Sequence, residues 1–201
     1  MMPVKKSFFA QDTVKAAKRL LGKIIRYKDI TGRIVETEAY KGFPDEASHA
    51  CKKTARSAIM YESYGKIYVY FIYGNYYCLN LTTEKGKPGA VLIRALQPLS
   101  GIKKMAKRRG INIGNIDVSK QESLVNLTNG PGKLCQALGI TKELNDTTVG
   151  DKIKILNSNL TLRKSDIAAT SRIGITKAQH LKWRFYIKNN NFVSKRENLA
   201  K

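Results

Sequence analysis

The chain has 201 residues, a length typical of one domain. Its 37 lysine and arginine residues against 15 aspartate and glutamate residues give a formal net charge of +22, which indicates a polyanionic partner, chiefly nucleic acid. An apolar content of 42% is that of a folded domain and excludes a disordered basic tail. The longest apolar stretch, 67–73, is far shorter than the ~18–20 residues that span a bilayer, so we expect no membrane segment.

The N-terminal part of the chain predicts a helix and a hairpin. Asp12 or Thr13 is placed to cap a helix that Gly22 ends. Two strands are expected over 23–27 and 33–40, joined by a turn that uses Asp29, Thr31 and Gly32.

The middle of the chain predicts three buried strands. Residues 66–81 are almost all apolar or aromatic, with Gly74 as a break, which indicates a strand, a turn and a second strand. Another strand is expected over 90–95, after a turn at 86–89.

The C-terminal half begins with a helix over 101–109, whose basic run we interpret as a solvated face. A second helix is expected over 131–138, with Pro131 near its start and Gly139 after its end, and further strands over 152–156 and 183–187. The expected fold class is α+β, with a mainly antiparallel sheet in a single domain over 1–201.

The cysteines predict neither a disulfide framework nor a zinc site. Cys51, Cys78 and Cys135 are an odd number and lack a CxxC pair, and only two histidines are available to join them. We expect reduced thiols in a cytosolic compartment.

Tyrosine is concentrated in one segment. Seven of the ten tyrosines are Tyr61, Tyr64, Tyr68, Tyr70, Tyr73, Tyr76 and Tyr77. A strand that packs its rings into the core is the favoured interpretation for Tyr68 and Tyr77. In so basic a protein, the rings beside Gly74 also suit a surface on which bases stack.

Two carboxylates share a face of the expected strand over 33–40, because side chains alternate along a strand. Glu36 is best explained by an ion pair with a lysine or arginine. Glu38 is the candidate general base, since a carboxylate near a polyanion is otherwise unfavourable. His49 alone is more typical of a structural histidine than of a catalytic group.

Several motifs together resemble one known family. They are Arg33-Ile-Val-Glu-Thr-Glu-Ala-Tyr40 followed by Gly42, Asp45, Glu46, Ala47 and His49; Tyr68-Val-Tyr70 with Tyr73-Gly74, Cys78 and Asn80; Ala90-Val-Leu-Ile-Arg94-Ala-Leu96; and Gly130-Pro-Gly-Lys133-Leu-Cys-Gln-Ala-Leu138. In this order they resemble the alkyladenine (3-methyladenine) DNA glycosylases. The chain departs from the family pattern at Ser57, Asn75 and Gln97.

The resemblance implies a curved antiparallel sheet and a monofunctional glycosylase that flips a damaged purine out of duplex DNA. Glu38 matches the family's water-activating carboxylate. Tyr40 and Tyr70 match the walls of the base pocket, with His49 on its floor. Asn80 matches the residue that obstructs the 2-amino group of normal guanine.

The resemblance also implies how DNA is held. Tyr73 matches the side chain that fills the gap left by the flipped nucleotide, and Arg94 matches an arginine that contacts a phosphate. Tyr76 and Lys133 are further expected DNA contacts. The implied chemistry needs neither a metal nor an organic cofactor. We expect a monomeric prokaryotic enzyme that acts on the chromosome in the cytoplasm.

Two alternatives stay open. A non-catalytic nucleic-acid-binding protein would use the tyrosines to stack bases and both glutamates only for ion pairs. An enzyme module for another polyanion, such as the tRNA-binding part of a formyl-transferring enzyme, would not need Asn80 to exclude guanine.

Overall fold

The computed structural model describes residues 1–72 and 74–194. The helices are α1 (Thr13–Leu20), α2 (Ala58–Glu62), α3 (Ile102–Arg108), α4 (Gln121–Thr128) and α5 (Pro131–Leu138). The strands are β1 (Ile24–Tyr27), β2 (Ile30–Lys41), β3 (Ile67–Ile72), β4 (Tyr76–Thr82), β5 (Gly89–Ser100), β6 (Ile153–Leu156), β7 (Ile167–Thr170) and β8 (Arg184–Ile187). All pairings between these strands are antiparallel, which confirms the expected α+β class.

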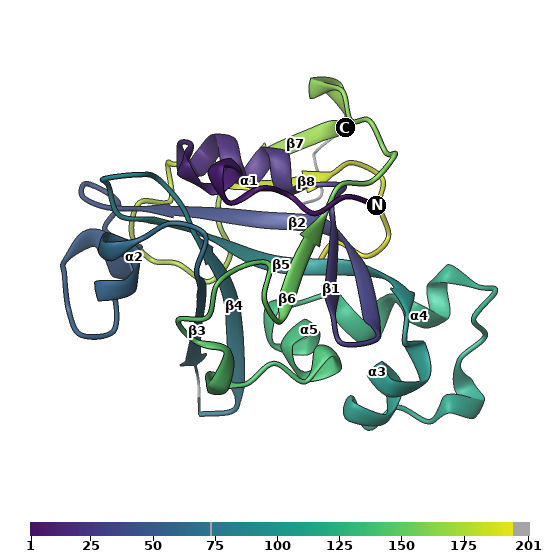
Figure 1. The fold of residues 1–201 in the computed structure, drawn as a ribbon. Coiled ribbons are helices and arrows are strands. Elements are labelled where there is room, and N and C mark those ends of the chain that lie inside the picture. Colours follow the sequence, from purple (N-terminus) through teal and green to yellow (C-terminus); the bar gives the residue numbers. More distant parts are fainter. Residues whose placement is uncertain (73, 195–201) are drawn as a thin grey trace.

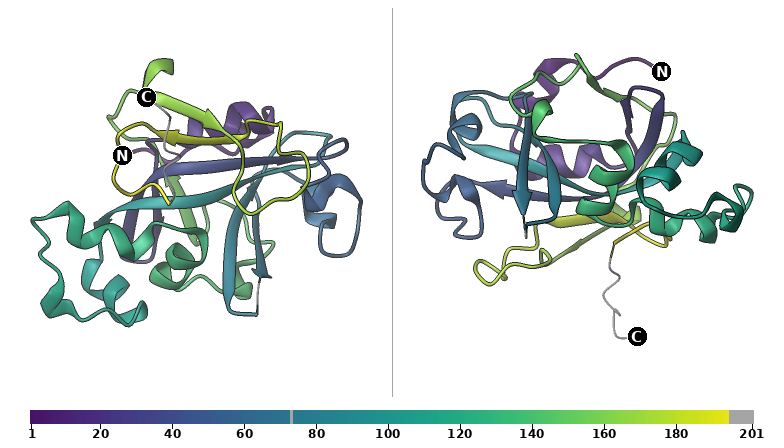
Figure 2. Two further views of the ribbon diagram at one scale, coloured as in Figure 1. Left: turned by 180° about the vertical axis from the view of Figure 1, so that it is seen from behind. Right: turned by 90° about the horizontal axis from the view of Figure 1, so that it is seen from below.

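The sheet is strongly curved around the two long strands β2 and β5. Its order is β3-β4-β5-β2-β1-β6, and β8 joins β2 to β7. Figure 1 shows α1, β7 and β8 on one side of β2, whereas β3, β4, β1, β6 and the helices α3 to α5 lie on the other. The view from behind shows the same separation (Figure 2, left). The main core takes fully buried side chains from α1, β5 and α5, such as Leu20, Ile93 and Leu134.

The N-terminal helix follows the sequence prediction. Asp12 caps α1 by accepting a hydrogen bond from the Lys15 backbone N–H, and Gly22 follows its end with a φ of 80°. This confirms both the start and the stop signal.

The predicted turn of the first hairpin was right for Asp29 and wrong for Thr31 and Gly32. Tyr27 pairs with Ile30, so the turn consists of Lys28 and Asp29 alone. Lys28 has a φ of 54°, the left-handed conformation that a tight two-residue turn requires. Thr31 and Gly32 therefore belong to β2.

Strand β5 is longer than predicted and contains Pro98, opposite Gly32 of β2. Its other neighbour, β4, pairs only with Ala90 to Leu92. Pro98 therefore lies where β5 has one hydrogen-bonded neighbour, which tolerates a residue without an N–H. The short elements α2, α4 and β7 carry no clear periodic pattern and were not predicted.

A double irregularity between β2 and β5 shapes the site. Ile34 pairs with Leu96, Glu36 with Ala95 and Thr37 with Ile93, so Arg94 has no directly opposed partner in this ladder. Such bulges redirect side chains. Thr37 bonds to the Ala17 carbonyl of α1, so Glu36 and Glu38 project from the other face of β2.

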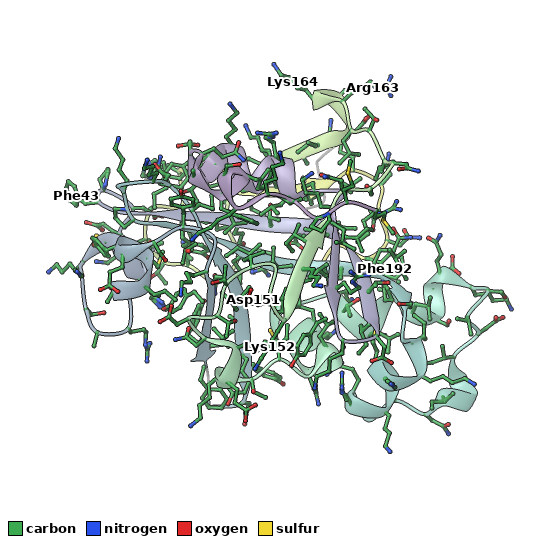
Figure 3. All side chains as sticks on the ribbon, viewed as in Figure 1. Phe43, Asp151, Lys152, Arg163, Lys164 and Phe192 are labelled. Carbon is green, nitrogen blue, oxygen red and sulfur yellow. The ribbon has the colours of Figure 1, made fainter. Side chains whose placement is uncertain are left out.

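Basic side chains surround the molecule. In Figure 3 their blue nitrogen tips project around the whole outline, including Lys164 near β7. Within the described residues, no helix is long and apolar enough to cross a membrane.

Candidate active site

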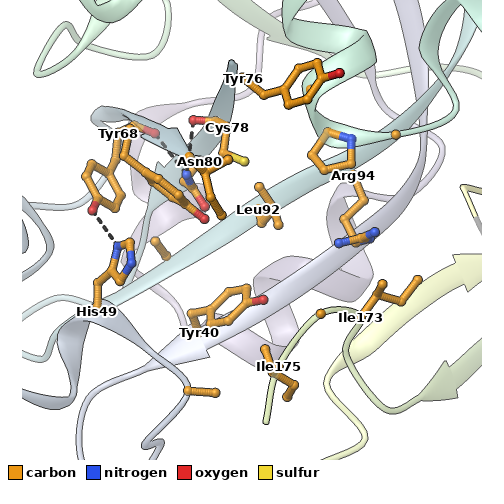
Figure 4. A pocket seen from close by; sticks show the side chains of 18 of the residues that line it. Tyr40, His49, Tyr68, Tyr76, Cys78, Asn80, Leu92, Arg94, Ile173 and Ile175 are labelled. Atoms are coloured by element: carbon orange, nitrogen blue, oxygen red, sulfur yellow. Dashed lines mark hydrogen bonds between the residues drawn. The ribbon is translucent and has the colours of Figure 1, made fainter. Parts of the chain in front are cut away.

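A pocket of about 580 Å³ lies on the face of β2 to β5 opposite α1. Even-numbered residues of the strands line it: Tyr40, Tyr68, Tyr70, Ile72, Tyr76, Cys78, Asn80, Ala90, Leu92 and Arg94. The period of two along each strand puts these side chains on one face. The start of α5 and the segment 173–175 complete the wall (Figure 4).

Aromatic rings form one end of the pocket. The His49 and Tyr70 ring centroids are 4.7 Å apart, and those of Tyr68 and Tyr70 are 5.4 Å apart. His49 Nδ1 is hydrogen-bonded to the Tyr68 hydroxyl at 2.8 Å. Partial desolvation in the pocket, with repulsion from Arg56, lowers the pKa of His49, while burial raises the pKa of Tyr68 to about 12. Both shifts favour the neutral forms of His49 and Tyr68 near pH 7, so this end of the pocket is lined by uncharged, polarisable rings.

The structure qualifies the predictions for the tyrosine cluster. Tyr77 packs against the core, as expected. Tyr68 is buried, but it lines the pocket together with Tyr70. Burial, followed by interactions with the Cys78 thiol, raises the pKa of Tyr70, so its hydroxyl is neutral.

Asn80 is held rigidly among the strands. Its amide nitrogen donates to the carbonyls of Tyr68 and Cys78, at 3.1 and 3.4 Å. These two acceptors determine which end of the amide carries the nitrogen, so the amide oxygen is directed away from them. Asn80 is almost fully buried in the pocket wall. Because its side chain is fixed, it restricts the shape of any group that binds in the pocket.

Glu38 lies immediately behind the pocket wall and is completely buried. Its Oε1 accepts a hydrogen bond from the Ile173 backbone N–H at 2.8 Å. Its Oε2 accepts one from the Tyr40 hydroxyl at 2.8 Å and faces Arg94 Nη1 at 3.4 Å. All three partners line the pocket, so the carboxylate is one atomic layer from it. Burial, followed by Glu38, raises the pKa of Tyr40, which keeps that hydroxyl a donor.

Arg94 connects the two glutamates. Its Nε donates to Glu36 at 3.0 Å, its Nη1 faces Glu38 and its Nη2 is 3.3 Å from the Ser194 hydroxyl. Glu36 also accepts from Arg184 Nε at 2.7 Å, which confirms the predicted ion pair for Glu36. Arg94 is buried in the pocket wall, and its contact with a DNA phosphate stays a prediction.

Two of the remaining predicted DNA contacts, Tyr76 and Lys133, line the pocket. Tyr76 is half exposed, and Lys133 lies in the lining beside Arg109. Desolvation and repulsion from Arg109 lower the pKa of Lys133. Gly132 lets α5 approach Tyr76, because a Cβ there would lie 2.7 Å from the ring. Tyr73 lies outside the described residues.

For one buried ion pair at the site, no sequence signal indicated that its two members meet: Asp45 belongs to a motif quoted above, whereas Arg172 was not singled out. Arg172 donates to both carboxylate oxygens of Asp45, at 2.7 and 2.6 Å, and its guanidinium carbon is 4.5 Å from the centre of the Tyr40 ring. The next residue, Ile173, supplies the N–H that Glu38 accepts. Asp45 and Arg172 are 127 residues apart, so neither helical nor strand periodicity relates them.

Comparisons with known proteins give one consistent family. A family model described as methylpurine-DNA glycosylase (MPG) matches residues 7–191. A protein of Prosthecochloris aestuarii is 44% identical over 94% of this chain and 90% of its own length. Others, from Clostridium novyi and Bacillus cytotoxicus, are each 43% identical, over 98% and 94% of this chain and 100% and 97% of their own lengths. All three are named "Putative 3-methyladenine DNA glycosylase". With the family model and these relatives spanning nearly its whole length, the chain belongs to the methylpurine-DNA glycosylase family.

Proposed function

We propose that this protein is a monofunctional DNA glycosylase of base excision repair. It flips an alkylated or deaminated purine, of the 3-methyladenine, 7-methylguanine or hypoxanthine type, out of duplex DNA and hydrolyses the N-glycosidic bond. The observation that carries the proposal is the Glu38 carboxylate directly behind a pocket with aromatic walls.

The pocket chemistry suits a damaged purine. Its volume of about 580 Å³ is ample for a bicyclic base, and the rings of Tyr40, Tyr70 and His49 offer stacking surfaces. Alkylation at a ring nitrogen makes the base cationic and weakens its bond to the sugar. A cation over an aromatic face gains ~0.5–2 kcal/mol, so the pocket favours such a base over an undamaged one. Asn80 is the proposed barrier to the 2-amino group of guanine.

Glu38 is the proposed general base. The contact between Glu38 Oε2 and Arg94 Nη1, at 3.4 Å, is the longest of the three around the carboxylate. We place the attacking water there, where it bonds to Glu38 and accepts from Arg94. As the base leaves, positive charge develops on the sugar, and the same carboxylate stabilises that charge while it takes the proton of the water.

DNA is the proposed macromolecular partner. Lys133 and Tyr76, in the lining of the pocket, are placed to contact the backbone beside a flipped nucleotide. Tyr73 is proposed, from its sequence motif, to fill the vacated space in the duplex. Hydrolysis by an activated water uses no metal or organic cofactor. We expect a monomer that acts in the bacterial cytoplasm.

The test is release of a base from defined DNA. Purified protein is incubated with a duplex that carries one hypoxanthine, and separately with DNA treated with a methylating agent, and abasic sites are scored as strand breaks after alkali. We expect breaks only after alkali treatment, and a loss of breaks with Glu38→Gln. Tight binding to both DNAs without any abasic site would instead support the non-catalytic alternative. Breaks without alkali would contradict the monofunctional assignment.

A further inference from the structure

The Asp45–Arg172 ion pair lies directly behind one pocket wall. Both side chains are completely buried, and Arg172 stacks on Tyr40 at 4.5 Å. Tyr40 lines the pocket, whereas Arg172 does not, so the guanidinium covers the face of the ring that points away from the cavity. The Arg172 guanidinium carbon is also 5.5 Å from the centre of the Trp183 ring.

The pair is also hydrogen-bonded to the backbone of the residues before and after Tyr40. Arg172 Nη1 donates to the Ala39 carbonyl at 2.9 Å, and Asp45 Oδ2 accepts from the Lys41 N–H at 3.1 Å. Asp45 and Arg172 together therefore fix both the ring of Tyr40 and the backbone on either side of it. A buried pair of this kind is weak evidence for stability in itself, because desolvation offsets much of the attraction.

Its electrostatic effect on the pocket is more specific. A guanidinium alone behind Tyr40 would repel a cationic base stacked on the front of the ring and would compete for the same ring electrons. The Asp45 carboxylate, bound to both Nη atoms, cancels most of that field. A neutral purine would be almost indifferent to the charge behind the ring.

On the basis of the function proposed above, we propose that Asp45 is a positioning and specificity residue. The Arg172 guanidinium holds the Tyr40 ring in place from behind. Because Asp45 neutralises the charge of that guanidinium, the front of the ring can still stack on a positively charged, alkylated purine.

The size of the effect follows from the geometry. The carboxylate lies roughly 12 Å from a stacked base, given the 4.5 Å between guanidinium and ring, a stacking distance of ~3.5 Å and an ion pair about 4 Å across. At an effective dielectric constant of about 20, removal of that charge weakens the binding of a cationic base by about tenfold.

The appropriate readout is kcat/KM. During bond cleavage the positive charge passes from the base to the sugar, so in the transition state it is still on the flipped nucleotide, shared between the two. The ratio kcat/KM measures the transition state against free enzyme and free DNA. For Asp45→Asn we expect the loss mainly as a higher KM.

The experiment measures kcat/KM for release of 7-methylguanine and of hypoxanthine from matched duplexes, with melting temperatures recorded in parallel. We expect Asp45→Asn to lower the value for 7-methylguanine by about tenfold and that for hypoxanthine by less than about twofold. The control is Glu46→Gln, which removes the same charge from an exposed neighbour paired with Lys177. It should change neither value.

A second variant separates charge from packing. Asp45→Asn combined with Arg172→Gln removes both charges, and it should restore release of 7-methylguanine to within about threefold of the wild type. Equal losses on both substrates, or a folded double variant worse than Asp45→Asn, would overturn this inference and leave the proposed function standing. Wild-type protein that releases neither base would overturn the proposed function itself.

Discussion

Glu38→Gln tests the chemistry most directly. Because Glu38 accepts from donors on both oxygens, the amide of glutamine must turn its NH₂ group toward at least one of them. The Tyr40 hydroxyl can rotate to accept from that NH₂, but Arg94 Nη1 then loses its acceptor. Leaving one buried donor without a partner costs ~1–3 kcal/mol of stability. For a chain of this length that corresponds to a fall of about 2–4 °C in Tm for each kcal/mol.

The loss of activity should be much larger than this loss of stability. Removal of a general base lowers base release by ~10²–10⁴-fold, which is about 3–5 kcal/mol in the activation barrier. Single-turnover release from a lesion duplex measures it, and an equilibrium binding assay should show lesion affinity nearly unchanged.

A matched control lies one residue away on the other face of β2. Thr37 is equally buried, and its hydroxyl donates to the Ala17 carbonyl. Thr37→Val should cost a comparable ~1 kcal/mol of stability and leave release at the wild-type rate. Release by Glu38→Gln within tenfold of wild type would refute the assignment of the base. So would an equal loss in the Thr37→Val control.

Three further results are expected. Arg94→Ala leaves Glu36 and Glu38 buried without one of their cations, so chemical denaturation should show a loss of ~3–5 kcal/mol. Lys133→Ala should reduce the slope of log affinity against log salt concentration by about one, whereas Lys164→Ala, near β7, should leave it unchanged; equal slopes for both variants would place the DNA elsewhere. The pKa of His49 is lowered below its ordinary 6.5, so the unfolded chain binds this proton more readily, and the free energy of unfolding falls as the pH drops below about 6.5. Thermal melts of His49→Gln at pH 5 and pH 8 should therefore differ less than those of the wild type, and an identical difference would contradict the assigned direction.

Local signals in the sequence were sufficient for most elements. The capping position of Asp12 and the stop at Gly22 bracket α1, and Pro131 begins α5. These signals act within one turn of helix, so they can be read without knowledge of the fold. The first hairpin turn was partly misplaced because the left-handed Lys28 is not a residue type that favours that conformation.

The sequence alone determined which side chains share a face: the alternation along a strand puts Glu38 and Tyr40 together, and Tyr68 with Tyr70. Only the tertiary structure decided what surrounds them. The bulge that frees Arg94 depends on how β2 and β5 pair, and the Ile173 N–H reaches Glu38 across 135 residues of chain. Periodicity describes neighbours along one element, whereas these contacts arise from tertiary packing, which brings segments far apart in the sequence against a buried carboxylate.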